Sequence, residues 1–455
     1  MRINLGIPMP LHEIARASGG RLLNDENPTI YSISTDTREL QPKDLFIAIK
    51  GENFDGETFT KEAKEMGAYV LSGCRNNTDI YRDDSIAALL SLAEYYIKNL
   101  PIILYRIGIT GSVGKTTTKE FLNILLSRRY KCHISDGNHN NHIGMPMSIL
   151  SAPPDTQVII MEMGMNHVGE IRRLTNCLRP NLALITNIGT AHIGNLGSRE
   201  NIAKAKLEIT EGMVEGKTIV PFDEPLLTGI KNRVTFSFTN IDADYFFEAI
   251  DNEISVFRHG VFYAKSTLML TEQHNILCMA SAVTSAIETG ISPCDLAEGI
   301  ALISRDNTRQ SVFYMKDYTF YTDFYNASLE SVTAFIHEAV AYSKSEEKSL
   351  LLGDVLELGN MSRDIHFRIG MSISKNIFTN LFLVGEQSKY IAEGAIQNSF
   401  PKDRIFINPD PRTPELTARQ IRENCKVGNT IFMKASRGIR LERILCCFDE
   451  QSEEK

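Results

Sequence analysis

The sequence lacks several features that would assign it to a special class of protein. No apolar stretch approaches the roughly 20 residues that a helix needs to cross a bilayer, so we expect no membrane insertion. The first 20 residues lack the basic start and the unbroken apolar core of a secretory signal, which predicts a cytoplasmic protein. Internal repeats and low-complexity tracts are also missing, which excludes a repeat architecture or a disordered linker protein.

Positive charge and cysteine motifs are scarce as well. The formal net charge is −8, so nothing in the overall electrostatics favours binding to nucleic acid. Any anionic substrate must therefore be held by local groups. The eight cysteines include no C-x-x-C pair, which argues against a zinc site and against a disulfide framework. We expect reduced thiols that serve mainly in packing.

What is present is the composition of an ordinary globular protein with several domains. Apolar residues make up 43% and charged residues 23% of the 455 residues, and a chain of this length forms two or three domains. Composition and pattern predict three α/β domains, at 1–100, 101–308 and 309–455. The second is expected to be a central, mostly parallel sheet of the P-loop ATPase kind, and the third a Rossmann-like open sheet.

The most informative stretch is Arg106–Arg129, which reads as a strand, a glycine-bearing loop and a helix. Glycines allow backbone N–H groups to close around phosphate oxygens, and the helix N-terminus adds partial positive charge. Lys115 can bridge the β- and γ-phosphates, and a threonine hydroxyl can hold Mg²⁺. The expected nucleotide-binding residues are Gly111, Ser112, Val113, Gly114, Lys115, Thr116 and Thr117. Ile109 stands where the general P-loop pattern has glycine, so the loop predicts a nucleotide site but not its subclass.

Alternating short apolar runs and helical patterns predict the remaining elements. The stretch 230–271, richer in aromatic and alternating residues, predicts an antiparallel insertion. Strands are expected at 44–50, 69–72, 158–161, 182–185, 218–221, 349–352, 381–384 and 430–433, and helices at 11–19, 59–66, 85–97, 275–289 and 365–375.

Polar residues follow several of the expected buried strands. Glu162 and Asn187 each end such a strand, so they should lie at the same sheet edge as the phosphate loop. Mg²⁺ prefers few protein ligands and hard oxygens, which Thr116 or Thr117 together with Glu162 would supply. The alternative for Glu162 is a solvated carboxylate at the end of a strand.

Other residues have two interpretations on chemistry alone. His192 lies in a glycine-rich loop where an imidazole is accessible, yet a lone histidine is more often structural. Lys204 and Lys206 begin a helix and are equally consistent with a solvated face. Asp323 and Asn326 follow an aromatic strand and can grip a ribose or base edge, or simply form a turn. Arg309 can serve as a mobile positive charge for a γ-phosphate, or lie on the surface.

Five segments together resemble the Mur ligases, whose nucleotide loop departs from the general spacing in the same way. They are Thr110–Thr118, Gly137–Gly144, Glu162–Ile171, Thr186–His192 and Ala203–Lys206. Further agreement comes from Gly353–Gly359 with His366, from Lys434–Arg437, and near the N-terminus from Asp36–Arg38, Asp44–Phe46 and Asp55–Gly56. The resemblance covers the whole length of the chain.

The resemblance implies an ATP-dependent ligase that forms a C–N bond in the synthesis of peptidoglycan precursors. Its expected substrates are UDP-N-acetylmuramoyl-tripeptide and D-alanyl-D-alanine, joined through an acyl phosphate. The first domain would hold the nucleotide sugar, the second ATP and two Mg²⁺ ions, and the third would close over ATP and bring in the dipeptide. We expect no nucleic-acid partner and a monomer.

The resemblance also implies roles for individual residues. Lys115, Lys206, His192 and Arg309 would be catalytic, and Lys206 would be carbamylated so that a cation becomes a carboxylate-like metal ligand. Metal ligands would be Thr116, Thr117, Glu162, His192 and Lys206. Nucleotide contacts would include Asn275, Arg309, Asp323, Tyr325 and Asn326. Substrate residues would be Thr37, Arg38, Asn138, Asn140, Asn141, Asn166, His167, Asp354, Glu357 and Arg437.

Some positions depart from the family pattern, chiefly around the third domain. The family usually shows Asp-Ser-Tyr-Asn-Ala-Asn-Pro where this chain has Asp323–Leu329, and Pro-Gly-Arg where Asp306-Asn-Thr precedes Arg309. Gln273 and Cys278 replace a common glycine and a common asparagine. These departures keep a second hypothesis open, a related ligase with a different amine acceptor. A third, a nucleotide-hydrolysing switch without ligase activity, conflicts with Glu162, His192 and Lys206, because a simple NTPase needs no second metal site.

Overall fold

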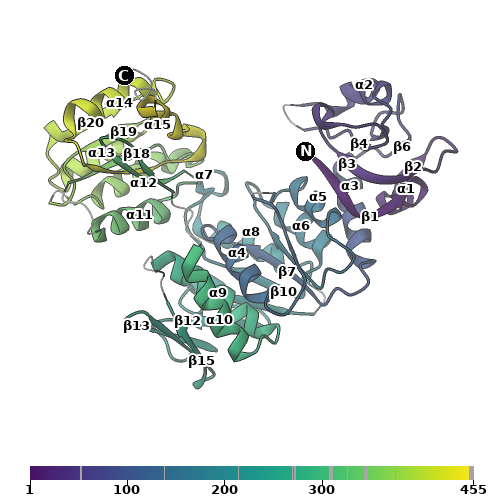
Figure 1. Cartoon of the computed structure of the whole chain (residues 1–455), viewed down its shortest axis with the longest axis horizontal. Coiled ribbons are helices and arrows are strands. Elements are labelled where there is room, and N and C mark those ends of the chain that lie inside the picture. Colours follow the sequence, from purple (N-terminus) through teal and green to yellow (C-terminus); the bar gives the residue numbers. More distant parts are fainter. Residues whose placement is uncertain are drawn as a thin grey trace. The chain divides into compact units, whose positions relative to one another are not determined.

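Three sheets follow one another along the chain (Figure 1). The computed structural model describes residues 1–51, 54–137, 139–213, 215–268, 270, 273–306, 311–324, 326–342, 347–374 and 376–449. These residues divide into two compact units. The first unit comprises 1–187, 203–269 and 277–304, and the second unit comprises 188–202, 270–276 and 305–455. The predicted three-part α/β fold class is confirmed.

The N-terminal sheet has the strand order β1-β3-β4-β5-β6-β2. Strands β3 to β6 run parallel, while β1 and β2 pair antiparallel at the two edges. The longest helix here, α3, begins after Asp84, whose carboxylate caps it by accepting two backbone N–H groups. The strands are β1 (Arg2–Pro10), β2 (Arg21–Leu22), β3 (Thr29–Ser34), β4 (Leu45–Ile47), β5 (Tyr69–Ser72) and β6 (Ile80–Tyr81), and the helices are α1 (Leu11–Ser18), α2 (Thr60–Glu65) and α3 (Ser85–Lys98).

The central sheet has the order β15-β14-β13-β12-β11-β10-β7-β9-β8. Its strands run parallel from β8 to β13, and the pairs from β13 to β15 are antiparallel. The strands are β7 (Tyr105–Thr110), β8 (Cys132–Ile134), β9 (Val158–Glu162), β10 (Leu182–Ile185), β11 (Lys217–Pro221), β12 (Arg233–Ser237), β13 (Tyr245–Ile250), β14 (Glu253–Arg258) and β15 (Val261–Thr267).

The predicted antiparallel insertion at 230–271 is therefore only partly correct. Strand β12 pairs in parallel with β11 and with β13, so this stretch continues the central sheet. Alternating apolar and polar residues indicate that one face of a strand is covered and the other exposed. Parallel strands near the edge of a sheet can have this pattern as well as the antiparallel strands of a hairpin. The structure describes 230–268 and 270 of this range.

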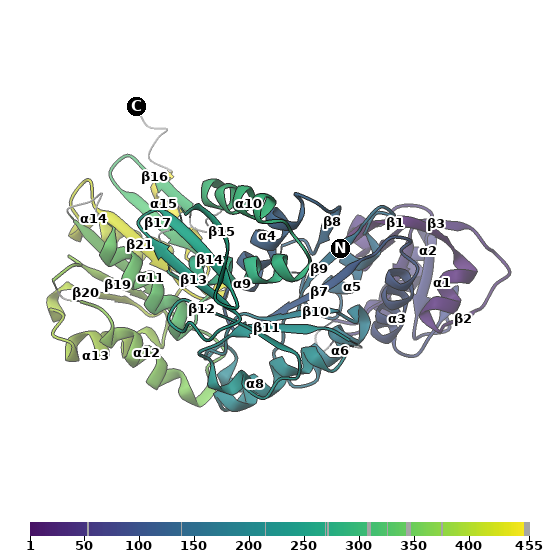
Figure 2. The ribbon, with the colours of Figure 1, turned by 90° about the horizontal axis from the view of Figure 1, so that it is seen from below.

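Helices cover both faces of the central sheet, as an open parallel sheet requires. Figure 2 shows α4 and α10 on one face and α6 on the other. The helices of this region are α4 (Lys115–Leu126), α5 (Gly144–Leu150), α6 (Glu170–Leu178), α7 (Ile193–Leu196), α8 (Arg199–Leu207), α9 (Gln273–Glu288) and α10 (Pro293–Asp306).

The C-terminal sheet has the order β16-β17-β21-β18-β19-β20 and is parallel except for β16. Helices α14 and α15 pack on one face of it, and α11 contacts the other face through Phe335 and Phe432 (Figure 1). The strands are β16 (Ser311–Tyr314), β17 (Thr319–Asp323), β18 (Lys348–Gly353), β19 (Leu381–Val384), β20 (Ile405–Asn408) and β21 (Thr430–Lys434), and the helices are α11 (Leu329–Ala341), α12 (Ser362–Met371), α13 (Ser388–Gln397), α14 (Pro414–Asn424) and α15 (Glu442–Asp449).

Most predicted elements are present, and their ends differ by a few residues. The strands 69–72, 182–185 and 381–384 have the predicted bounds. The strand expected at 44–50 is shorter, and the helix expected at 365–375 begins three residues earlier and ends at Met371. None of the helices in the described part of the chain combines the length and apolar character that crossing a bilayer requires.

Candidate active site

The phosphate loop of the first unit joins the end of β7 to the start of α4. Lys115 is the first residue of the helix, and its Nζ donates a hydrogen bond to the carbonyl oxygen of Gly111 at 2.9 Å. A side chain at Gly111 would not fit, because its Cβ would lie 1.9 Å from the Thr186 hydroxyl oxygen. The loop therefore follows the predicted strand–loop–helix arrangement, with its lysine folded back over the loop.

Thr186 and Asn187, the two residues that directly follow β10, fix the conformation of this loop. Asn187 Oδ1 accepts the backbone N–H groups of Ser112 and Val113 at 3.2 and 3.0 Å, and its Nδ2 donates to the Val113 carbonyl at 3.0 Å. The Thr186 hydroxyl donates to the same carbonyl at 2.6 Å. Asn187 was predicted at this edge of the sheet, but without a role. Its three hydrogen bonds identify it as a residue that shapes the loop.

Glu162 is a buried carboxylate beside the same loop, with an exposed fraction of 1%. One oxygen accepts a hydrogen bond from the Thr116 hydroxyl, and the other accepts from Asn140 Nδ2 at 2.8 Å. Among the described residues it has no ion-pair partner, so its charge is left without a cation in a buried place. Hard oxygen donors around an uncompensated charge suit a divalent cation such as Mg²⁺. Of the two threonines considered, Thr116 is the one that contacts Glu162.

The described residues contain no group of three or more His, Cys, Asp or Glu side chains that could hold a metal by themselves. This is compatible with Mg²⁺, which usually takes one or two carboxylates and completes its shell with water and substrate phosphates. Glu162 and Thr116 together offer the small number of oxygen donors that such a site takes from the protein.

Lys206, near the end of α8, is buried with an exposed fraction of 1%. Burial lowers the pKa of its ammonium group well below the ordinary value, and the positive charge of Lys115 lowers it further. Lys204, two residues earlier, is exposed. The two lysines, which the sequence alone does not distinguish, therefore differ sharply, because Lys206 is buried and Lys204 is exposed.

A 210 Å³ pocket lies between the loop that follows β8 and the loop that follows β9. Three predicted substrate residues, Asn140, Asn141 and Asn166, line it together with Arg173 from the first turns of α6. The guanidinium of Arg173 has no ion pair or side-chain hydrogen bond within the described parts of the chain. Arg173 could not be predicted from the sequence, because one charged residue on an amphipathic helix carries no distinguishing signal.

Other residues expected at the substrate lie nearby in sequence or in the N-terminal sheet region. His167 is exposed next to Asn166, whereas Asn138 lies outside the described residues. Thr37 is buried, and Arg38 is exposed and paired with Asp36, which holds the pKa of that carboxyl well below its usual range. Their assignment to the nucleotide sugar stays a prediction.

In the second unit, His192 and Glu357 face each other. His192 Nδ1 lies 2.7 Å from Glu357 Oε2. Just before it, Thr190 donates two hydrogen bonds to Glu330, from its backbone N–H at 2.9 Å and from its hydroxyl at 3.0 Å. The segment that carries the expected metal ligand is thus bound by two carboxylates.

A 130 Å³ cavity of the second unit collects several expected residues. His192, Asn326, Glu357 and Arg437 line it. Asp354, which directly follows β18, is not among the lining residues; its exposed fraction is 5%, burial raises the pKa of its carboxyl, and the backbone N–H of Gln387 donates a hydrogen bond to it.

The expected nucleotide contacts of the second unit are only partly described. Asp323 pairs with Lys434, whose Nζ lies 2.5 Å from its carboxylate and also donates to the carbonyl of Asn326 at 2.9 Å. Asn275 is buried. Arg309 and Tyr325 lie outside the described residues.

Comparison with known proteins assigns the chain to a family. The model of the Mur ligase middle domain matches residues 109–286, and that of the Mur ligase family catalytic domain matches residues 29–101. The UDP-N-acetylmuramoyl-tripeptide--D-alanyl-D-alanine ligase of Bacillus subtilis is 35% identical over 453 residues, covering 96% of this chain and 98% of that protein. The chain belongs to the Mur ligase family.

Solved structures agree with this assignment. A crystal structure of MurF from Acinetobacter baumannii superposes with a TM-score of 0.85 at 25% identity and covers 99% of this Mur ligase and 100% of that chain. The MurF ligase of Thermotoga maritima, solved in complex with ADP, superposes with a TM-score of 0.76 at 25% identity, covering 92% and 97% of the two chains.

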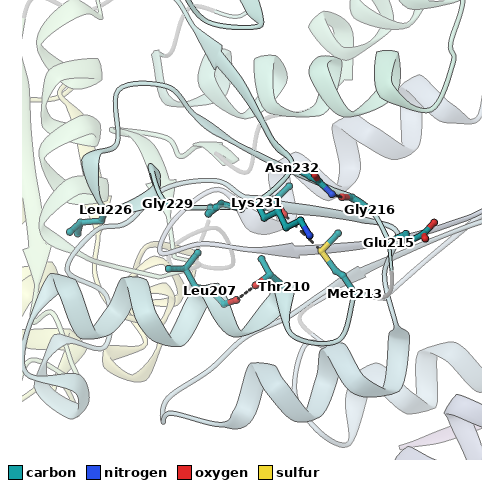
Figure 3. A pocket seen from close by; sticks show the side chains of 11 residues that line it. Leu207, Thr210, Met213, Glu215, Gly216, Leu226, Gly229, Lys231 and Asn232 are labelled. Carbon is teal, nitrogen blue, oxygen red and sulfur yellow. Dashed lines mark hydrogen bonds between the residues drawn. The ribbon is translucent and has the colours of Figure 1, made fainter.

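A further cavity of about 950 Å³ lies away from the phosphate loop of this Mur ligase (Figure 3). Gly216 and Asn232, which line it, directly precede β11 and β12, so it opens at the amino ends of these strands. The phosphate loop follows the carboxyl end of β7, which runs in the same direction. Its charged lining residues, Glu215 and Lys231, are exposed. The cavity is therefore separate from the candidate active site.

Proposed function

We propose that this Mur ligase joins D-alanyl-D-alanine to UDP-N-acetylmuramoyl-tripeptide at the expense of ATP, in the synthesis of peptidoglycan precursors. The observation that carries the proposal is the match to a ligase of that name along 96% of the chain. The phosphate loop with Lys115, and the buried Glu162 beside it, are the parts that an ATP-dependent ligase needs.

The first half of the reaction activates a carboxylate, which is otherwise a poor electrophile. A carboxylate oxygen of the tripeptide attacks the γ-phosphorus of ATP, the bond from that phosphorus to the β,γ-bridging oxygen breaks, and ADP leaves. Lys115 and the backbone N–H groups of the loop stabilise the negative charge that accumulates on the phosphate oxygens. Thr116 and Glu162 would hold Mg²⁺, whose charge would supply further stabilisation of these oxygens.

The second half forms the new amide bond. The dipeptide amine attacks the carbonyl carbon of the acyl phosphate, the amine loses a proton, and inorganic phosphate leaves with the bonding electrons. Arg437 is a suitable partner for the dipeptide carboxylate, because guanidinium groups bind carboxylates in a two-pronged geometry. Asp354 and Glu357 stay predicted substrate residues.

Lys206 is proposed to carry a carbamate. Its neutral amine would attack CO₂, forming a nitrogen–carbon bond and releasing a proton, so that a buried cation becomes an anion that can serve as a metal ligand. The lowered pKa of this lysine and its burial support the proposal, because only an unprotonated amine reacts with CO₂. With His192, the carbamate would serve a second Mg²⁺.

Each domain is proposed to bind one reactant. Residues 1–100 would hold the nucleotide sugar, with Thr37 and Arg38 near the uridine. Residues 101–308 would bind ATP, and residues 309–455 would close over it, with Arg309 on the γ-phosphate and Asn275 and Asp323 on the nucleotide. Asn140, Asn141 and Asn166 would hold the peptide of the nucleotide sugar. They line one pocket, and Asn140 also donates a hydrogen bond to Glu162, which supports this assignment.

Phosphate release from ATP tests the function, combined with a mass spectrum of the product. We expect release to require both UDP-N-acetylmuramoyl-tripeptide and D-alanyl-D-alanine, and the product to gain the mass of one dipeptide residue. Release with the nucleotide sugar and only another amine would assign the chain to a related acceptor specificity. Release that is indifferent to both would contradict the ligase proposal.

A further inference from the structure

His192 and Glu357 both adopt a backbone conformation that residues with side chains rarely take. Each has φ of 64°, in the left-handed region, where a residue other than glycine costs on the order of 1 kcal/mol. Such conformations persist only where the surrounding structure enforces them, and they gather at functional sites. Here the two side chains meet, with His192 Nδ1 2.7 Å from Glu357 Oε2.

The backbones on both sides of this pair are pressed together. The N–H of Gly194 donates to the carbonyl oxygen of Glu357 at 3.1 Å. A Cβ at Gly194 would lie 2.5 Å from that oxygen and 2.5 Å from the nitrogen of Gly359. Only glycine permits this close approach of the two backbones. The position of the loop that carries Glu357 is therefore fixed relative to the segment that carries His192.

The contact with Glu357 favours one tautomer of the His192 imidazole. His192 Nδ1 is buried and makes no hydrogen bond of regular geometry among the described residues, but the Glu357 Oε2 atom lies 2.7 Å from it. A carboxylate oxygen at 2.7 Å repels a ring lone pair and favours a proton on that nitrogen. The other ring nitrogen, Nε2, then keeps its lone pair, and His192 lines the cavity that also contains Arg437.

We propose that Glu357 is a positioning residue that acts through His192: it holds the ring in the Nδ1–H tautomer and presents Nε2 as a ligand atom for a cation of the ligase reaction. Carboxylates play this part for histidine ligands in other metal sites. The use of Nε2 rests on the proposed function, whereas the tautomer does not.

The test reads the tautomer directly, by ¹⁵N NMR of the full-length protein with labelled histidines at alkaline pH, where imidazoles are neutral. His192→Gln assigns the resonances. We expect the wild-type ring to carry its proton on Nδ1, Glu357→Gln to retain this form through its amide oxygen, and Glu357→Ala to move toward Nε2–H. Gly194→Ala should have the same effect as Glu357→Ala by displacing the loop.

Binding of Mn²⁺ in the presence of ADP, followed by electron paramagnetic resonance, gives the second readout. Glu357→Ala should weaken binding about 10- to 100-fold, the usual effect of removing a partner of a metal ligand. Glu347→Gln, which alters a surface pair with Lys426 in the same unit, should leave both readouts unchanged.

A wild-type ring with its proton on Nε2, or a tautomer that Glu357→Ala leaves unchanged, would overturn the inference even if the protein is an active ligase. An unchanged Mn²⁺ affinity in Glu357→Ala would overturn the ligand role of His192. An inactive wild-type protein with the expected tautomer would instead count against the proposed function.

Discussion

Lys206 of the first unit and Lys434 of the second are both 1% exposed, yet their surroundings differ. Lys434 lies 2.5 Å from the carboxylate of Asp323 and donates to a backbone carbonyl, so its charge is paired. Lys206 has no acidic partner within the described part of the chain, and its pKa is lowered by burial and by Lys115. Burial alone does not mark a reactive lysine. The absence of a counter-charge does, because it favours the neutral amine.

The largest effect is expected from Lys115→Ala, which removes the cation next to Lys206 as well as the phosphate contact. We expect ligation to fall by about 10³-fold, the upper end of the loss of one charge-stabilising donor. Phosphate release under saturating substrates measures it. Near-normal activity would contradict the assignment of the phosphate loop.

The next effect concerns Lys206 itself. Lys206→Ala should lose about 10²-fold or more in kcat, because the proposed carbamate ligand is gone. Added formate or acetate should restore part of this activity by occupying the place of the carbamate. Lys204→Ala, on the exposed side of the same helix, is the matched control and should be nearly normal. Full activity of Lys206→Ala would show that the carbamate proposal is wrong.

For the paired lysine the expected effect is on stability. Asp323→Ala leaves Lys434 buried and uncompensated, which should lower the free energy of unfolding by about 3 kcal/mol. The double variant Asp323→Ala/Lys434→Met should recover much of this loss, since the buried charge is removed as well. Denaturant unfolding of both variants measures the difference. Equal stability of the two would mean that the pair does not compensate the charge.

A smaller effect should separate two neighbouring arginines of α6. Arg172 is paired with Glu211 and Glu208, whereas Arg173 lines the 210 Å³ pocket. Arg173→Gln should raise the KM for the nucleotide sugar about 10-fold, equivalent to about 1.4 kcal/mol, because an ionic hydrogen bond to a substrate carboxylate is lost. Steady-state kinetics with the matched variant Arg172→Gln provide the control. The same KM in both variants would remove Arg173 from substrate binding.

Local sequence patterns were sufficient to predict a functional feature where its residues lie close together in the chain. The loop before α4 could be predicted because a strand, glycines, a lysine and a helix follow one another within a few residues. Glu162 could be placed beside it, because parallel strands end at the same edge of a sheet. The stretch 230–271 was predicted only in part, because the alternation of its residues indicates which face is covered and not the direction of the neighbouring strand.

The sequence by itself determined the three α/β domains, the phosphate loop and the family, since these depend on short-range order and on motifs in a fixed succession. Only the tertiary structure decided that Lys206 and not Lys204 is buried, that Asn187 shapes the phosphate loop, and that Glu357 meets His192. Each of these depends on desolvation or on a contact between residues far apart in the chain. Neither is encoded in the spacing of neighbouring residues, because both arise only when separate elements pack together.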